Sequence, residues 1–409
     1  MALLPKKIKN SQLLTILTPE VKKIFSIFGD EIRLVGGAVR NLIIDLEIND
    51  FDFATKLIPN KVKQKLQQNN IKYIDLAEKF GTIIAIVNKK NFEITTLRKD
   101  YQNDGRHCNV KFSTSFFEDA KRRDFTINAL YLDQNGVIYD YFDGINHLKN
   151  GIICFIGDAK LRIKEDYLRI LRFLRFSAKF ANHINDEGLK YCIELQNNLT
   201  KLSKSRIRDE FIKMIKIDDH KKLINLLQIL EKYNFWQILF DNDLQIDNFN
   251  NLLSLQEDLK ISFTLSLKIA TIFLNKNTDI SQLKYNLNLT RKEYQYLQFF
   301  RKNLNDANYN QIDFSNSFFE LLSFNDIYLV RDFCIFSKIS NKQINLQSIK
   351  EILDFLQDYM VANFPLNGKD VLRLGFKNEE VGLMLKKCKI NWLKSKFKMS
   401  KKDLLQLIS

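Results

Sequence analysis

The sequence predicts an α+β fold, in which a small mixed sheet with helices forms the N-terminal part and helices alone form the remainder. Short apolar runs rich in β-branched residues, such as 82–87, are typical of buried strands and occur in the first 150 residues. From residue 213 onward, one helical segment follows another, with short breaks that contain Asn and Asp. The chain has only 13 glycines and 4 prolines, and this scarcity favours long helices over a turn-rich β fold.

Length, charge and cysteine content limit the classes of protein to which this chain can belong. The 409 residues are enough for about two to four domains, and the 45% of hydrophobic residues allow a sizeable core. A net charge of +15 suits a polyanionic partner, although frequent Lys, Ile, Asn and Phe also fit an A/T-rich coding sequence. The five scattered cysteines argue against a disulfide framework or a zinc site. Without a signal peptide or a membrane-spanning apolar stretch, we expect a cytoplasmic protein.

Local signals predict the N-terminal elements in order. Thr18-Pro19 supplies an N-cap and a proline at the first helical position, so a helix is expected to about Phe28. A short strand over 32–35 and a helix over 38–44 should follow, and then a second strand that carries Asp50 and Asp52. A helix over 60–69 and strands over 82–87 and 92–97 complete a small mixed sheet with helices on one side.

The first strand ends in a glycine pair that opens the next helix. Glycine allows the backbone to adopt positive φ or to approach a ligand closely. The first N–H groups of the helix then face the turn, which suits a phosphate chain, and Arg40 in the first helical turn can add charge-assisted bonds to phosphate oxygens. We therefore expect Gly36, Gly37 and Arg40 to bind the phosphates of a nucleotide.

Two carboxylates, Asp50 and Asp52, are separated by one residue on the next expected strand. Side chains at i and i+2 of a strand point the same way, so this pair can share two divalent ions in an in-line displacement. Phe51 and Phe53 should face the core. Asp-x-Asp alone usually means a solvated strand, but the glycine turn ahead of it favours catalysis. Glu93 is a candidate third carboxylate, and a solvent-facing strand residue is the alternative.

These residues carry a resemblance to a known family. Gly36-Gly37-Ala38-Val39-Arg40 followed by Asp50-Phe51-Asp52 resembles the first motif of the class II tRNA nucleotidyltransferases and bacterial poly(A) polymerases, in the DNA polymerase β-like nucleotidyltransferase superfamily. The resemblance implies that Asp50 and Asp52 are catalytic and hold Mg²⁺. Asn41, Cys154 and Ala159 replace the usual Asp, Arg and Pro of the family. None of these departures removes an expected metal ligand.

Residues 122–129, Arg-Arg-Asp-Phe-Thr-Ile-Asn-Ala, match the second motif of the family over its whole length. The match implies that Arg123 bonds phosphate or ribose oxygens. It also implies that Asp124 accepts a hydrogen bond from the ribose 2′-OH, the group that separates NTP from dNTP. A salt bridge at a helix start is the simpler alternative for these charged residues.

A strong helix is expected over 162–179, and it matches the Glu-Asp-x-x-Arg motif of the family. Within it, Asp166 and Arg169 are i and i+3, so they should be neighbours on one helix face. A carboxylate can accept from the exocyclic amine of C or A while the arginine donates to the adjacent ring atom. U and G present the opposite pattern and would leave both groups unpaired.

Two further arginines of this helix, Arg172 and Arg175, are expected to help place the nucleotide. The alternative for the whole helix is a set of ordinary surface ion pairs. Residues 202–211 resemble the fifth motif of the family, in which Arg206 and Glu210 should form an i,i+4 pair that buttresses the neck.

Two basic or polar segments have less specific sequences. The polar stretch 98–110, with Asp104 and Arg106, resembles the flexible loop that helps CCA-adding members change from C to A addition, and any exposed loop would look similar. Residues 386–402 are rich in Lys, with Trp392 and Phe397 interleaved. They fit either a phosphate track with stacking groups or a solvated helix face.

The resemblance implies four parts, which are a nucleotidyltransferase head over 1–150, a helical neck for nucleotide selection over 151–215, a helical body over 216–345 and a tRNA-binding tail over 346–409. The implied reaction is template-independent addition of C, C and A to the tRNA 3′ end from CTP and ATP. The expected partners are tRNA, through its 3′ end and acceptor/T-arm region, and the two nucleotides. A poly(A) polymerase or an A-adding tRNA enzyme is the nearest alternative, and an inactive RNA-binding relative is the alternative from another class.

Overall fold

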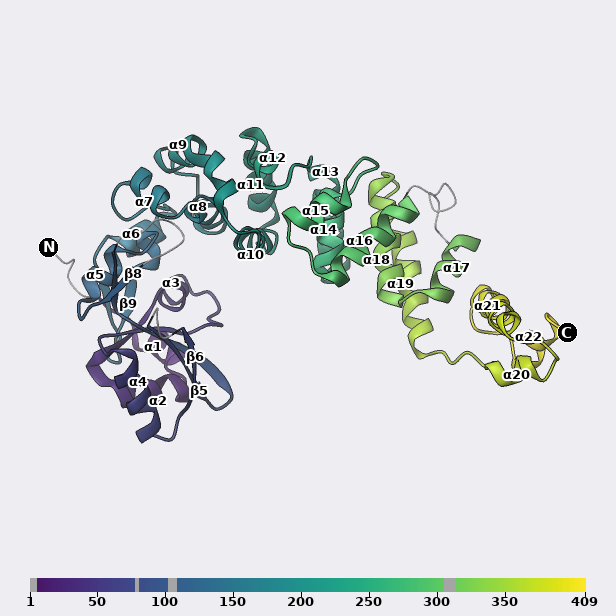
Figure 1. Ribbon diagram of the computed structural model, residues 1–409, viewed down its shortest axis with the longest axis horizontal. Coiled ribbons are helices and arrows are strands. Elements are labelled where there is room, and N and C mark those ends of the chain that lie inside the picture. The colour runs from purple at the N-terminus through teal and green to yellow at the C-terminus, as the bar shows by residue number, and fades with distance from the viewer. Residues whose placement is uncertain (1–5, 78–80, 102–108, 305–313) are drawn as a thin grey trace. The chain divides into compact units, whose positions relative to one another are not determined.

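The computed structural model describes residues 6–77, 81–101, 109–304 and 314–409 (Figure 1). The predicted loop residues Asp104 and Arg106 lie outside these ranges. The chain divides into two compact units, Met1–Leu226 and Leu227–Ser409, and the first holds all the other candidate site residues. A division into two does not test the four predicted domain boundaries, which stay a prediction.

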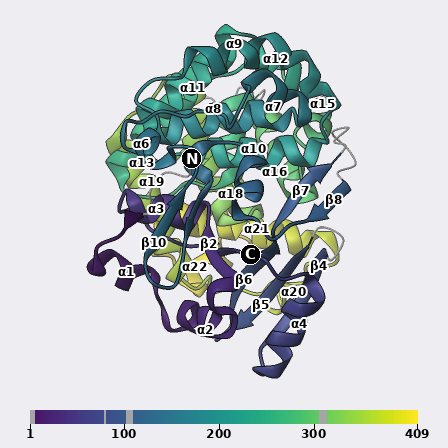
Figure 2. The ribbon, with the colours of Figure 1, turned by 90° about the vertical axis from the view of Figure 1, so that its left-hand side faces the viewer.

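The first unit is built on a mixed sheet (Figure 2). In the described part of the chain this sheet has eight strands. In spatial order these are β1 (Lys6–Lys7), β10 (Val137–Asp140), β9 (Leu130–Leu132), β2 (Ile32–Val35), β3 (Asp52–Thr55), β6 (Lys90–Thr96), β5 (Thr82–Val87) and β4 (Lys72–Ala77). Strands β3 and β6 run parallel, and β2 runs antiparallel to both β3 and β9. The centre of the sheet therefore carries the predicted catalytic strand.

Four helices cover one face of this sheet, namely α1 (Asn10–Ile16), α2 (Pro19–Phe28), α3 (Gly37–Ile43) and α4 (Pro59–Gln68). The hydroxyl of Thr18 accepts a hydrogen bond from Val21 N at 3.3 Å, and Pro19 opens α2 as predicted. The buried side chains of these helices pack with inward-facing residues of the strands, including Leu34 and Phe53. The predicted α+β class is confirmed. The bounds of α2, α3 and α4 differ from the expected ones by about one residue, whereas α1 was not predicted.

The opposite face of the sheet carries α5 (Phe116–Lys121), whose Phe116 and Ala120 pack with Val35, Ala54 and Tyr131. Beside it, β7 (Arg98–Tyr101) and β8 (Asn109–Phe112) form an antiparallel pair. The stretch predicted as a loop over 98–110 therefore begins and ends in strands. Thr126–Asn128 form a 3-10 turn before β9, and α6 (Gly144–Lys149) follows β10.

The rest of the first unit is helical, with one departure from prediction. Instead of one helix over 162–179, there are two, α7 (Ala159–Glu165) and α8 (Leu168–Phe180), with Asp166 and Tyr167 between them. Asp166 has extended backbone (φ −155°, ψ 106°), and its carboxylate accepts from Leu168 N at 3.1 Å. Aspartate competes for backbone donors in this way, which favours helix ends over helix interiors. α9 (Asp186–Leu195) and α10 (Lys204–Met214) follow.

In the described part of the second unit, all the regular secondary structure is helical. Helix α11 (His220–Lys232) includes the boundary between the units. The others are α12 (Phe235–Phe240), α13 (Ile246–Leu259), α14 (Leu265–Phe273), α15 (Ile280–Asn286), α16 (Arg291–Leu304), α17 (Asn316–Phe324), α18 (Ile327–Ser340), α19 (Leu346–Val361), α20 (Gly368–Leu372), α21 (Glu379–Lys394) and α22 (Lys401–Gln406). Trp392 is buried against Phe364 and Phe397, so it belongs to the core of this unit. Among the described residues, no helix combines the length and apolar character needed to cross a membrane.

Candidate active site

The glycine turn forms between β2 and α3 as predicted. Gly36 has φ +71°, a backbone conformation that residues with a Cβ rarely adopt. Its N–H donates to the carbonyl of Leu130 at 3.2 Å. A Cβ at this position would lie 3.6 Å from Nη1 of Arg123, and one at Gly37 would lie 3.7 Å from Nη2 of Arg40. The turn therefore brings bare backbone next to two guanidinium groups.

Arg40 is held by protein contacts and is only 9% exposed. Its Nη1 donates to Oδ1 of Asn128 at 2.6 Å and its Nη2 to Oδ1 of Asn41 at 3.1 Å. The guanidinium carbon lies 4.4 Å from the ring centre of Phe180 on α8. Burial, together with the positive charge of Arg175, lowers the pKa of Arg40 to about 10, so the group remains a cation at neutral pH. These contacts fix α3 against α8, and direct phosphate binding by Arg40 stays a prediction.

Asp52 is the first residue of β3 and lies opposite Val35 of β2 and Glu93 of β6. Asp50 precedes the strand, so the prediction that both aspartates are strand residues is wrong by two positions. The predicted alternation nevertheless holds. The rings of Phe51 and Phe53 lie 5.9 and 6.4 Å from that of Phe92 on the core side, while Asp50, Asp52 and Glu93 are exposed.

The electrostatics of this carboxylate group favour a cation. Loss of solvation, then repulsion by Glu93 and Asp50, raise the pKa of Asp52 to about 6, against the attraction of Arg123. Asp52 keeps an exposed side chain, so its desolvation is partial and the repulsion between carboxylates is the firmer cause. Oxygen donors of this kind are the preferred ligands of hard divalent cations. The residues therefore fit the metal that the resemblance implies, although no three His, Cys, Asp or Glu side chains converge on one point in the described ranges.

Asp124 lies within a chain of charged contacts that reaches the neck helices. Its Oδ1 accepts from Asn128 Nδ2 at 3.0 Å, and its Oδ2 accepts from Nε and Nη2 of Arg172 at 2.7 and 2.6 Å. Although burial opposes it, the charge of Arg172 holds the pKa of Asp124 below its usual range. Glu210 on α10, which is 2% exposed, accepts from Nε of Arg175 at 2.6 Å and lies 3.6 Å from Arg172.

The two proposed base-selecting residues have separate partners. Oδ2 of Asp166 accepts from Nη2 of Arg206 at 2.7 Å, while Nη1 of Arg169 donates to Oε2 of Glu165 at 2.7 Å. The predicted i,i+3 pair on one helix face is therefore wrong, because Asp166 lies in the break before α8. The predicted pair of Arg206 with Glu210 is replaced by Arg206 with Asp166 and Glu210 with Arg175.

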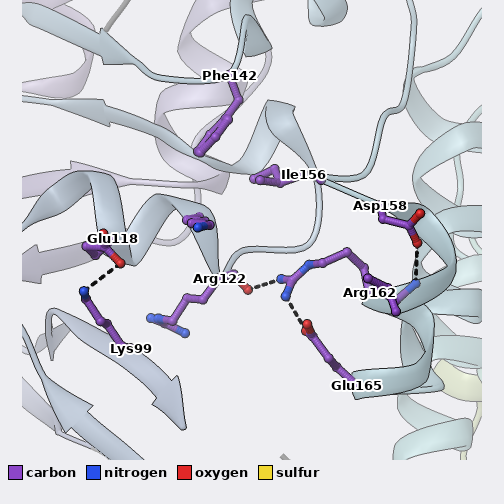
Figure 3. Close-up of a pocket in the computed structure, with 11 residues that line it drawn as sticks. Lys99, Glu118, Arg122, Phe142, Ile156, Asp158, Arg162 and Glu165 are labelled. Carbon is purple, nitrogen blue, oxygen red and sulfur yellow. Dashed lines mark hydrogen bonds and ion pairs between the residues drawn. The ribbon is translucent and has the colours of Figure 1, made fainter. Parts of the chain in front are cut away.

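A cleft of about 590 Å³ lies beside these residues, between α5, β7 and α7 (Figure 3). Arg162 extends across it and donates to the backbone carbonyl of Arg122 and to the Glu165 carboxylate. At its other side, Nζ of Lys99 lies 2.9 Å from Oε2 of Glu118. The cleft is therefore walled by paired charges of both signs.

Three contributors to the site were missed by the sequence analysis. Asn128 joins Arg40 to Asp124, and Asp119 and Tyr131 hold Arg123. The sequence does contain a signal for Asp119, which precedes Arg123 by four residues. This is the spacing at which ion pairs form on a helix.

Comparison with known proteins identifies the family. The profile described as poly A polymerase head domain matches residues 32–154. The chain is 32% identical to the mitochondrial CCA tRNA nucleotidyltransferase 1 of Danio rerio, over 100% of this chain and 94% of that protein. It is also 31% identical to the CCA-adding enzyme of Staphylococcus haemolyticus, over 93% and 94% of the two chains.

Solved structures agree with the fold. A CCA-adding enzyme in an apo form superimposes with a TM-score of 0.75 at 18% identity and covers 99% of each chain. The Thermotoga maritima CCA-adding enzyme complexed with tRNA gives a TM-score of 0.73 with the same coverage and identity. Because identity above 30% extends over the full length of curated relatives, the chain belongs to the nucleotidyltransferase family that contains the CCA-adding enzymes and the poly(A) polymerases.

Proposed function

We propose that this chain adds C, C and A to the 3′ end of tRNA from CTP and ATP, with release of pyrophosphate. The observation that carries the proposal is full-length similarity to proteins named as CCA-adding enzymes, from both a vertebrate mitochondrion and a bacterium. Structural neighbours include CCA-adding enzymes in complex with CTP, with ATP and with tRNA. Because the relatives come from different compartments, a cytoplasmic location for this chain stays a prediction.

Enzymes of this family generally depend on a divalent metal ion, and we propose Mg²⁺ held by Asp50 and Asp52. When bound, such ions lower the pKa of the attacking hydroxyl and stabilise the leaving pyrophosphate. Glu93, directly beside Asp52 in the sheet, adds negative charge to the same place. The exposure of all three carboxylates leaves them accessible to nucleotide and RNA.

The remaining residues of the proposed site bind and orient the nucleotide. Gly36 and Gly37 allow the phosphates to approach the backbone, and the free edge of the Arg123 guanidinium faces that turn. Asp124 and Arg172, bonded to each other, are proposed to meet the ribose.

Base selection is proposed to use Asp166 and Arg169, for which C and A offer matching edges. In the structure these residues bond to Arg206 and Glu165. Nucleotide binding would therefore exchange these protein contacts for contacts with the base. Arg175, held by Glu210, is proposed to support the same helix face.

The function can be tested with purified protein, Mg²⁺ and a tRNA transcript that lacks its last three nucleotides. CTP alone should add two nucleotides, and CTP with ATP should add three. A long ladder with ATP alone would identify a poly(A) polymerase, an activity that the head-domain match also allows. Extension only of transcripts that already end in CC would identify an A-adding enzyme. Absence of any extension would leave an inactive RNA-binding protein.

A further inference from the structure

A buried carboxylate on α5 is bonded to both arginines of the Arg-Arg-Asp motif. Asp119 is 1% exposed. Its Oδ1 accepts from Nε and Nη2 of Arg122 at 2.9 and 2.6 Å, and its Oδ2 accepts from Nη2 and Nε of Arg123 at 3.1 and 3.3 Å. One carboxylate therefore holds two guanidinium groups, of which Arg122 lines the cleft beside α7 and Arg123 lies at the glycine turn.

A tyrosine completes the support of Arg123. The hydroxyl of Tyr131 donates to Oδ2 of Asp119 at 2.8 Å and accepts from Nε of Arg123 at 3.0 Å. The Tyr131 ring is fully buried, lies 5.3 Å from the guanidinium carbon and packs edge-on against Phe116. Tyr131 lies on β9, so the sheet positions its backbone, and the packing of its buried ring holds the hydroxyl in place.

These bonds leave one edge of Arg123 available. A guanidinium has five N–H donors in a rigid fork, and protein acceptors occupy Nε and Nη2. Within the described ranges, Nη1 has no protein partner, and it is the atom that lies 3.6 Å from the position of a Cβ at Gly36. The bonds at Nε and Nη2 hold one edge of the planar guanidinium, and its opposite edge, which carries Nη1, is thereby directed at the glycine turn.

The charges of the group also suit an anion. Although burial alone would raise it, Arg123 and Arg122 hold the pKa of Asp119 at about 2, so the carboxylate is ionised at all working pH values. Two guanidinium cations and one carboxylate leave one unit of positive charge in a partly buried place. Such a site attracts a phosphate chain more strongly than an exposed arginine would.

We infer that Asp119 and Tyr131 are positioning residues, which fix the free edge of Arg123 at the glycine turn so that it binds the phosphates of the incoming nucleotide. The inference rests on the proposed function. It assigns neither residue a contact with substrate, since both act through Arg123. It also explains why the charged carboxylate of Asp119 is buried beside the Arg-Arg-Asp motif. An unpaired carboxylate in that place would cost free energy of folding.

The test compares Asp119→Asn and Tyr131→Phe with the wild type in single-nucleotide addition of CMP. Loss of phosphate binding that is equal in ground state and transition state raises KM and spares kcat. We expect the KM for CTP to rise at least tenfold in Asp119→Asn and about threefold in Tyr131→Phe, with the KM for tRNA within twofold of wild type. Asp133→Asn is the matched control, because Asp133 also bonds a tyrosine hydroxyl, that of Tyr139, in the same sheet at 3.1 Å.

A double-mutant cycle separates positioning from general damage. If Asp119 acts through Arg123, adding Asp119→Asn to Arg123→Ala should change the KM for CTP by less than twofold. A further tenfold rise in the double variant, or an equal rise in the KM for tRNA, would overturn the inference.

A spectroscopic readout covers the case in which Asp119→Asn unfolds or the wild type adds no nucleotide. The Nε–H signal of Arg123, assigned with Arg123→Lys, should shift in ¹H–¹⁵N spectra of Tyr131→Phe, because that nitrogen loses the nearer of its two acceptors and keeps only Oδ2 of Asp119 at 3.3 Å. An unchanged signal would refute the contact itself. Inactive wild-type protein with a shifted signal would reject the proposed function while retaining the positioning contact.

Discussion

The raised pKa of Asp52 leads to a prediction about metal binding. Its test also decides whether Glu93 acts on Asp52 by repulsion or is itself a metal ligand. If Glu93 acts by repulsion, Glu93→Gln should lower the pKa of Asp52 and make metal binding less sensitive to acid. If Glu93 is instead a third ligand, the same substitution should weaken metal binding at every pH. The two residues lie directly opposite each other on the parallel strands β3 and β6, so Gln at this position keeps the shape of the site and removes only the charge.

The size of the effect follows from competition between a proton and the metal for one carboxylate. With a pKa of about 6, Asp52 is about nine-tenths ionised at pH 7 and about one-tenth ionised at pH 5. The apparent metal affinity should therefore fall about tenfold between these pH values. With an ordinary pKa of about 4, the same interval changes the ionised fraction by only about a tenth. Since repulsion is one of two causes, we expect Glu93→Gln to reduce the tenfold fall to about threefold.

The assay is Mn²⁺ binding followed by electron paramagnetic resonance at pH 5, 6 and 7, without nucleotide or RNA. Glu47→Gln, an exposed carboxylate in the segment before Asp50, is the control for a change in net charge alone. A wild-type affinity that is flat from pH 7 to pH 5 would refute the raised pKa. A loss of more than tenfold at pH 7 in Glu93→Gln would refute the repulsion argument and make Glu93 a ligand.

Three further predictions concern contacts around the site. Arg206→Ala removes the 2.7 Å partner that the base must displace from Asp166, so the KM for CTP should fall about threefold while folding and the exclusion of UTP are retained. Glu210→Gln removes the buried charge that holds two arginines of α8, so the melting temperature should fall by several degrees and the KM for both nucleotides should rise. Gly144→Ala would place a Cβ 2.3 Å from the carbonyl oxygen of Thr126, and thermal unfolding should show a loss of about 2 kcal/mol or more.

Local sequence determined much of this site. The strand, glycine turn and helix over 32–43 were predicted within a residue, because apolar periodicity and glycine chemistry act between neighbours in the chain. The same holds for the alternation of Phe51 and Phe53 with the exposed aspartates. Family motifs then supplied the chemistry expected of these elements, and the comparisons confirmed the family.

Only the tertiary structure decided which charges pair. Arg206 bonds Asp166 across 40 residues, whereas spacing rules had predicted Glu210 as the partner of Arg206 and Arg169 as the neighbour of Asp166. Arg40, for which no protein partner was predicted, bonds Asn128 across 88 residues. A helix pattern also concealed the break at Asp166, whose carboxylate satisfies a backbone N–H of the next helix. The physical reason is that a charge that loses part or all of its water on folding takes whichever partner reaches it with good geometry, and that choice depends on the distance in space.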